Sequence, residues 1–207
     1  MNILIVAATS PEFGPEPIHP HHRIETFLTG VGLSQTAYTL GKKLNNYKPD
    51  LCIQIGIAGA YDHSISIGET VIVKQDCFAD LGANDRDGSF LHLTEILPCN
   101  PLNPFEQEYL IPAMPVIHTS LVMVNAISVN TVHGHQEAIN LAIKKYHPQI
   151  ETMEGAAFFA VCMTMGIPCI QLRSISNFVE PRNRASWKIG LAIKNLHAAL
   201  EVLLNHL

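Results

Sequence analysis

Three apolar runs, each about the length of a β-strand, most constrain how this chain can fold. They read MNILIVAA at the N-terminus, LCIQIGIAGA from Leu51 and CIQLRSI from Cys169. Short runs in which apolar residues predominate without strict alternation are typical of strands that are buried on both faces. The chain must therefore provide helices that cover both sides of a sheet.

Helical patterns lie between and after these runs. Apolar residues recur every three or four positions within Gly32–Leu44, Gln136–Tyr146 and Ala185–Leu204, and this spacing predicts amphipathic helices. A continuous apolar block, AAFFAVCM, follows Gly155 and predicts a buried helix, which Gly166 would end. The alternation of strands and helices predicts an α/β fold with three α/β/α layers.

Other segments are less regular. Gly56–Gly59 is expected to form a turn after the strand that begins at Leu51, and Ser120–Val124 is expected to be a short strand. Residues 81–115 are polar and interrupted by prolines, so their pattern predicts no particular element, although FADLGANDRDGSF could close a site or form an interface. No linker or repeat divides the sequence, and we expect one domain over residues 1–207.

Composition argues against several classes of partner. The 207 residues are 47% hydrophobic and 15% charged, and the formal net charge is −5. The Lys and Arg residues do not cluster, so the chain lacks the basic face that a nucleic acid would need. The apolar runs fall well short of the roughly 20 residues of a membrane-spanning helix. We therefore expect a cytoplasmic protein that binds neither nucleic acid nor membrane.

The cysteine and histidine residues predict no metal site, and no cofactor is expected. Five cysteines are scattered along the chain, which is typical of reduced core residues. The histidines of IHPHH and those beside Gly134 match neither the HExxH nor the CxxC pattern of zinc ligands. The segment TSPEFGPEPIHPHHR, rich in Pro, Gly and His, is expected to be a functional loop.

Two polar residues stand where predicted elements begin or end. Glu154 precedes the buried helix, where the helix macrodipole favours an ionised carboxylate, and Asn177 follows the strand that begins at Cys169. Ligands of open α/β sheets bind at the carboxyl ends of strands, so both side chains are expected to face one crevice. The alternative, that Glu154 only caps a helix and Asn177 only occupies a turn, stays open on residue types alone.

The order of motifs along essentially the whole chain resembles the purine nucleoside phosphorylase and nucleosidase superfamily. These motifs are Glu12 after the first strand, then GVG, IGIAGA, ETMEGAA and RSISN. Within the superfamily, NTVHG, MEGAAFF and ISNFVEPRNRASWKIGLAIKNL resemble the futalosine hydrolases. The resemblance implies a central mixed and twisted sheet flanked by helices, a small-molecule nucleoside substrate, no cofactor, and a homodimer or higher homo-oligomer.

The resemblance also implies roles for the candidate catalytic residues Glu12, Glu154 and Asn177. Met153 and Glu154 would hold the ribose, and Glu12 would activate water, unless it is only a solvated loop acid. Related nucleosidases that act on 6-aminopurines carry Asp where this chain has Asn177. A carboxamide can donate to a 6-oxo group and accept from a protonated N7, so Asn177 favours hypoxanthine, the base of futalosine.

Further residues are candidates for substrate contact. They are Ile57, Gly59, Asn130, Phe178, Arg182 and Arg184. The two arginines would meet the benzoate at the 5′ end of futalosine, Glu180 or a neighbouring subunit. Phe178 and Trp187 would line the same region or pack in the core.

Water is the expected nucleophile rather than phosphate. Superfamily phosphorylases bring arginines to the phosphate from the first loop and from the strand before the IGIAG-like turn, whereas here Glu12, Gln54 and Ile57 occupy those regions. The alternatives are a purine nucleoside phosphorylase, a methylthioadenosine-type nucleosidase and a catalytically silent nucleoside-binding protein. Asn177 disfavours the second, and its presence together with Glu12 and Glu154 disfavours the third.

Overall fold

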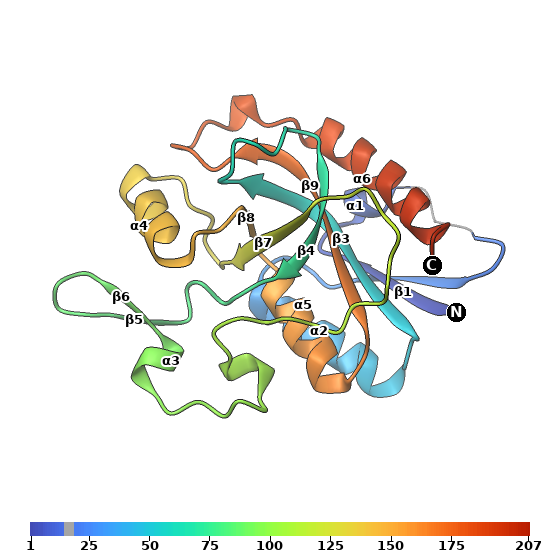
Figure 1. Ribbon diagram of the computed structural model, residues 1–207, viewed down its shortest axis with the longest axis horizontal. Coiled ribbons are helices and arrows are strands. Elements are labelled where there is room, and N and C mark those ends of the chain that lie inside the picture. The colour runs from blue at the N-terminus through green and yellow to red at the C-terminus, as the bar shows by residue number, and fades with distance from the viewer. Residues whose placement is uncertain (15–18) are drawn as a thin grey trace.

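The fold is built on a seven-stranded sheet in a computed structural model that describes residues 1–14 and 19–207 (Figure 1). Residues 15–18 of the expected functional loop lie outside the described residues. The strands of the sheet are β1 (Asn2–Ala7), β2 (Arg23–Leu28), β3 (Leu51–Ala60), β4 (Thr70–Gln75), β7 (Met123–Ser128), β8 (Ile150–Thr152) and β9 (Cys169–Phe178). Their order is β2-β1-β3-β8-β7-β4-β9, and β9 also pairs with β3. The sheet therefore curls back on itself.

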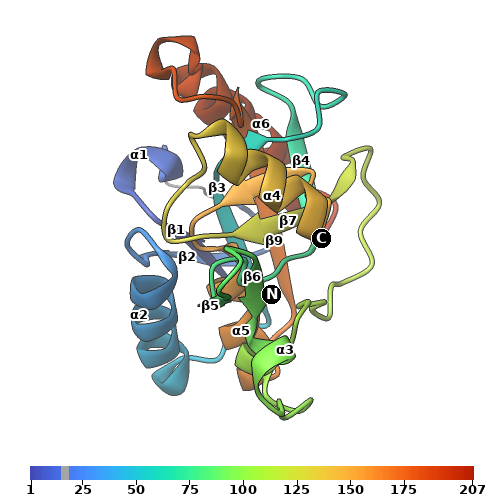
Figure 2. The same cartoon turned by 90° about the vertical axis from the view of Figure 1, so that its left-hand side faces the viewer.

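Helices cover both faces of this sheet, as Figures 1 and 2 show. The helix α6 (Ile189–Leu204) packs on one side, with the short α1 (Ser10–Phe13) beside it, and α2 (Leu33–Asn46) and α5 (Gly155–Met165) pack together on the other. The helix α4 (Gln136–Tyr146) packs at the end of β7. Strand β9 runs parallel to β3 and antiparallel to β4. The α/β fold with helices flanking a mixed sheet is thus confirmed.

The first strand shows why the apolar runs do not alternate in polarity. Leu4 and Val6 of β1 belong to the core cluster that includes α2 and α5, whereas Ile3 and Ile5 belong to the cluster beneath α6. Successive side chains of a strand point to opposite faces, so a strand between two helical layers needs apolar residues at every position.

The buried helix also forms as its sequence predicts. All residues from Gly155 to Cys162 in α5 are buried, and the helix ends at Gly166, whose φ of 65° is left-handed. Glycine accepts this conformation without a steric penalty from a Cβ atom.

Three expected boundaries differ from the structure. Gly56–Gly59 is not a turn but the second half of β3, which pairs with β9 as far as Ala60 and has an irregular register at Ala58/Gly59. Its glycines reflect crowding, because a Cβ on Gly56 would lie 2.3 Å from Nη1 of Arg173. The strand expected at Ser120–Val124 is β7, shifted along the chain. The last helix begins at Ile189, after a 3-10 turn at Arg184–Ser186.

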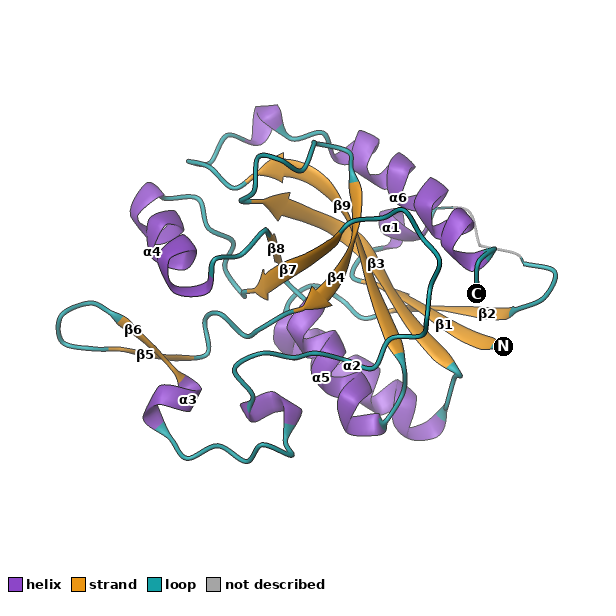
Figure 3. Cartoon of the chain, in the orientation of Figure 1, coloured by secondary structure: helices purple, strands orange, loops and turns teal. Residues whose placement is uncertain are grey.

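The segment without a clear pattern, residues 81–115, contains only short elements. These are β5 (Gly82–Asn84), β6 (Phe90–His92), α3 (Leu93–Ile96) and a 3-10 turn at Pro104–Glu106. Figure 3 shows β5, β6 and α3 projecting away from the central sheet. Elements of three or four residues are too short for a periodic pattern to predict them. Within the described ranges, no helix has the length and apolar character needed to cross a membrane.

The packing around Gly155 can be tested by adding one methyl group. A Cβ there would lie 2.2 Å from Oδ2 of Asp76 and 2.3 Å from Oε1 of Gln171, so we expect Gly155→Ala to lower the free energy of unfolding by about 1–3 kcal/mol. Gly41→Ala in α2 is the control, because a Cβ at Gly41 meets no atom within 4 Å and should stabilise the helix by up to about 1 kcal/mol. Urea denaturation measures both changes, and equal stability of the two variants would contradict this packing.

Candidate active site

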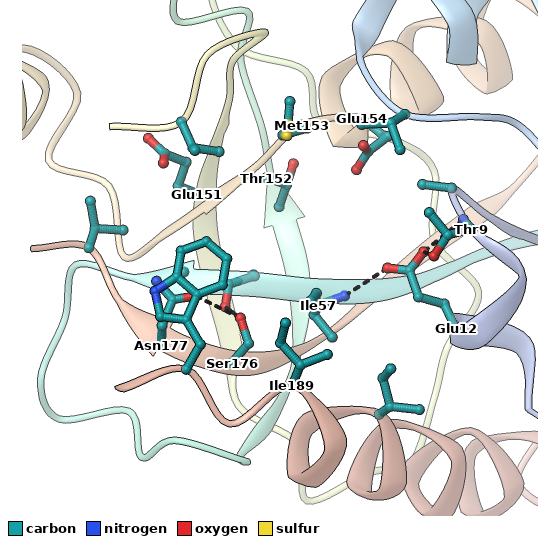
Figure 4. Close-up of a pocket in the computed structure, with 18 of the residues that line it drawn as sticks. Thr9, Glu12, Ile57, Glu151, Thr152, Met153, Glu154, Ser176, Asn177 and Ile189 are labelled. Carbon is teal, nitrogen blue, oxygen red and sulfur yellow. Dashed lines mark hydrogen bonds between the residues drawn. The ribbon is translucent and has the colours of Figure 1, made fainter. Parts of the chain in front are cut away.

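A cavity of about 530 Å³ opens where the carboxyl ends of β1, β3, β8 and β9 converge (Figure 4). Its polar lining includes Thr9, Glu12, His133, Glu151, Thr152, Glu154, Ser176, Asn177, Arg182 and Arg184. Glu12 and Glu154 stand at one side in Figure 4, and Glu151, Ser176 and Asn177 stand at the other. The expected crevice between Glu154 and Asn177 is therefore present, and its two sides carry different polar groups.

Glu12 is held in place by backbone and side-chain donors. Its Oε2 accepts hydrogen bonds of 2.9 Å from the backbone N and from Oγ1 of Thr9, and Oε1 accepts one of 3.3 Å from the backbone N of Ile57 (Figure 4). The carboxylate is only 7% exposed, so Glu12 is not a solvated loop acid. Such fixation suits a group that must receive a proton at a defined place.

Glu154 is buried, and its side chain makes no helix-capping hydrogen bond. Its Oε1 accepts from the backbone N of Gly32 at 3.2 Å, and its Oε2 lies 3.6 Å from Nη1 of Arg173. Burial raises the pKa of Glu154, and the nearby Arg173 opposes that rise. Besides the helix macrodipole expected from the sequence, the buried Arg173 thus provides a positive charge that favours the ionised carboxylate of Glu154.

Arg173 is the main residue of the site that sequence patterns do not reveal. It is 1% exposed within β9, where Nε donates to Oε1 of Gln171 at 2.9 Å and Nη2 donates to Oε1 of Gln54 at 2.7 Å. Gln171 extends this network, because its Nε2 donates to Oδ2 of Asp76 at 3.1 Å. An arginine inside the apolar run CIQLRSI was the available signal, since arginine is almost never fully buried without partners.

Asn177 belongs to β9 rather than to the loop after it. It pairs with Gly59 of β3, and its amide is fixed by Ser176 Oγ, which donates to Oδ1 at 2.7 Å (Figure 4). Its Nδ2 donates to the backbone O of Phe178 at 2.8 Å. These contacts orient the amide beside the cavity, so the alternative of a simple turn residue does not describe it.

Other candidate residues divide into two groups. Met153, Ile57, Gly59, Arg182 and Arg184 line the cavity, as does Trp187. Phe178 and Asn130 are not among the lining residues. Phe178 follows Asn177 in the strand, so it points to the opposite face, and it stacks on His63 at 4.2 Å between ring centroids. Asn130 is exposed and donates to Oδ2 of Asp80 instead.

The two arginines both line the cavity, and contacts to neighbouring residues place Arg182 next to Gly134 and Trp187. The backbone N of Arg182 donates to the backbone O of Gly134 at 3.1 Å, and its guanidinium lies 5.3 Å from the ring centroid of Trp187. Within residues 1–14 and 19–207, neither Arg182 nor Arg184 forms an ion pair with Glu180. Of the partners expected for them, Glu180 instead accepts a hydrogen bond of 3.4 Å from Oγ of Ser186.

His133, Glu151 and Tyr61 form a second polar cluster that sequence patterns also miss. Nδ1 of His133 is bonded to Oε2 of Glu151, and the hydroxyl of Tyr61 donates to the same oxygen at 2.8 Å. The backbone N of His133 donates to Oε1 of Glu151 at 3.0 Å. In the part of the chain that the structure describes, no group of three His, Cys, Asp or Glu side chains is arranged to hold a metal ion.

The fold and the cavity agree with the family that sequence comparison finds. A model of the phosphorylase superfamily matches residues 21–205, and the chain belongs to this superfamily. It is 29% identical to the futalosine hydrolase of Streptomyces coelicolor, over 94% of this chain and 87% of that protein. It is 30% identical to the futalosine hydrolase of Thermus thermophilus, over 85% and 79%. A 5′-methylthioadenosine/S-adenosylhomocysteine nucleosidase of Marinomonas is 23% identical, over 84% and 76%.

Solved structures share the fold at lower identity. The 5′-methylthioadenosine/S-adenosylhomocysteine nucleosidase and the futalosine hydrolase of Helicobacter pylori superpose with TM-scores of 0.83 and 0.82. Each is 16% identical, and each comparison covers 100% of this chain and 98% of the other. These named relatives are nucleosidases, that is, hydrolases of N-glycosyl bonds, and the expected class of enzyme is confirmed at that level.

The buried network behind Arg173 should make stability depend on pH. Burial raises the pKa of Asp76 from 3.8 to about 6, although hydrogen bonds from Gln171 and Ser128 lower it. The folded state thus binds this proton more tightly than the unfolded chain. Its contribution to stability is full below about pH 4 and is lost as pH rises through about 6.

The variant Asp76→Asn cannot ionise and therefore lacks this dependence. We compare the free energy of unfolding of the variant with that of the wild type. From pH 4 to pH 7, the difference should shift in favour of the variant by up to about 3 kcal/mol, because only the wild type loses stability as Asp76 ionises. Urea denaturation of both proteins at the two pH values measures the change. A difference between them that stays constant with pH would contradict the assignment.

Proposed function

We propose that this protein hydrolyses the N-ribosidic bond of futalosine, releasing hypoxanthine and dehypoxanthine futalosine in the futalosine route to menaquinone. The observation that carries the proposal is one cavity with two carboxylates at one side, one of them paired with the buried Arg173, and an oriented carboxamide at the other. A nucleoside has a sugar whose hydroxyls can donate to carboxylates and a base whose polar edge can pair with a carboxamide. The futalosine hydrolases among its relatives support the same substrate.

The ribose would lie beside Glu154. A carboxylate accepts hydrogen bonds from sugar hydroxyls, and its negative charge favours the oxocarbenium-like transition state of N-glycoside cleavage. Arg173 lies 3.6 Å from Oε2 of Glu154, and its positive charge offsets the desolvation cost of the buried carboxylate. Met153 lines the cavity and would give the sugar an apolar floor.

Water would attack the sugar carbon with Glu12 as the general base. Three hydrogen bonds fix the carboxylate at the Glu154 side of the cavity. A Cβ on Gly56 would meet both Nη1 of Arg173 at 2.3 Å and Oε1 of Glu12 at 3.0 Å, so the two groups flank one point. A general base needs to lie within hydrogen-bond reach of the proton that it takes, and the proximity of Glu12 to the Arg173–Glu154 pair supports this role if the ribose lies beside Glu154.

Phosphorolysis is disfavoured even though Arg173 is present. The guanidinium is fully buried and already bonded to Gln54 and Gln171, with Glu154 beside it. Two carboxylates and one guanidinium leave this side of the cavity with a net negative charge when all are ionised, which repels phosphate. Arg23, the basic residue of the first loop, begins β2 at the opposite end of the sheet.

Asn177 would select the base. Its carboxamide can offer a donor to a 6-oxo group and an acceptor to a protonated N7, as hypoxanthine requires. Arg182 and Arg184 line the same cavity and would meet the benzoate at the 5′ end of futalosine. The methylthioadenosine-type nucleosidases remain the second candidate, because they are also among the relatives. We further propose that the enzyme works as a homodimer or higher homo-oligomer.

Product analysis tests the substrate directly. We expect hypoxanthine from futalosine, and little base from inosine or from the 6-amino analogue of futalosine, when released bases are separated by chromatography. Adding phosphate should change neither the rate nor the sugar product, since water is the nucleophile. Release of no base from futalosine would overturn the proposed function, and a sugar 1-phosphate would overturn the hydrolytic mechanism.

The choice of base can be tested at a single position. Asn177→Asp replaces the amide donor with a carboxylate, so kcat/KM for futalosine should fall by about 10-fold or more while that for the 6-amino analogue rises, each lost hydrogen bond being worth about 1–3 kcal/mol. Asn130→Asp is the matched control, because Asn130 does not line the cavity. If the ratio of kcat/KM for futalosine to kcat/KM for the 6-amino analogue did not change in Asn177→Asp, the role of Asn177 would be refuted.

A further inference from the structure

The cluster of Tyr61, His133 and Glu151 has no part in the roles given above, although His133 and Glu151 line the same cavity. Glu151 is 4% exposed, and both of its oxygens are used. Oε1 accepts from the backbone N of His133, and Oε2 accepts from Tyr61 and is bonded to Nδ1 of His133. A buried carboxylate with this many partners fixes the orientation of the imidazole.

The cluster lies on the purine side of the cavity. Gly59 of β3 pairs with Glu151 on one side and with Asn177 on the other, so the two residues flank one backbone position. Figure 4 shows Glu151 on the same side as Asn177 and away from Glu12 and Glu154. A base held by Asn177 would therefore have His133 as a neighbour.

The proposed function, on which this inference rests, leaves one need unmet on that side. When an N-ribosidic bond breaks, its electron pair moves onto the departing purine, which must be stabilised or protonated. Asn177 has no acidic proton to give. Glu12 and Glu154 stand on the other side of the cavity.

We propose that His133, as an imidazolium, is a further catalytic residue that donates its Nε2 proton to the departing 6-oxopurine, with Glu151 and Tyr61 as positioning residues. Nδ1 is turned to Glu151, and Nε2, on the far edge of the ring, has no hydrogen-bond partner among the described residues. The Glu151 carboxylate stabilises the imidazolium, as a carboxylate does for the histidine of a Ser-His-Asp triad.

The step balances in atoms and electrons. The bond between the sugar C1′ and the purine N9 breaks, and its electron pair goes to the purine, which takes the proton from His133. Water forms the new bond to C1′ and gives its proton to Glu12. Exchange with solvent then returns both side chains to their starting states.

A substrate whose base needs no proton separates this role from a structural one. In futalosine methylated at N7, the purine ring is already positively charged before the bond breaks. Its base therefore leaves as a neutral molecule and needs no proton from the enzyme. For His133→Gln, we expect kcat on futalosine to fall about 100-fold or more, as for loss of a general acid, while kcat on the N7-methyl substrate stays within about threefold. KM should change little for either substrate. Glu151→Gln should show the same pattern with a smaller loss.

The control is His135→Gln, because His135 is exposed and does not line the cavity. It should leave both substrates unaffected. Equal losses on the two substrates in His133→Gln, or no loss on futalosine, would overturn the proposal. Wild-type protein that releases no base from futalosine would instead overturn the proposed function, and this inference with it.

Discussion

The buried charge of Arg173 is the constraint on which the polar interior of this protein depends. A guanidinium in the middle of a sheet is stable only when its donors and its charge are matched, since an unpaired buried charge costs several kcal/mol. Gln54, Gln171 and Glu154 provide that match, and Gln171 extends the network to Asp76. The same network also positions Glu154, the carboxylate that would face the ribose in the proposed function.

The crowding around this network explains the glycines that lie beside it. At Gly56 a side chain would collide with Arg173 and Glu12, and at Gly155 it would collide with Asp76 and Gln171. Gly56 lies inside β3, where glycine weakens the backbone by roughly 0.5–1 kcal/mol relative to alanine, and Gly155 is the first residue of α5. The space that they leave allows charged side chains to approach the strands closely, so local stability is traded for the arrangement of the site.

Local pattern predicted the framework well because burial acts on every residue of an element. The runs that became β1, β3 and β9 and the block that became α5 are mostly apolar, because they pack against neighbours on both sides. It failed where one residue type has two uses. Gly56–Gly59 has the composition of a turn but lies in a strand.

The sequence by itself determined the three-layer fold and the family, and it singled out Glu12, Glu154 and Asn177 as candidate site residues, because periodicity and motif order are carried by neighbouring residues. Only the tertiary structure decided what those groups meet. It brought Arg173 to Glu154 and set Glu151 and Asn177 on either side of Gly59. It also joined Tyr61, His133 and Glu151 into one cluster. The physical reason is that these partners lie far apart in the chain. Strand register and burial bring them together, and local sequence patterns reveal neither.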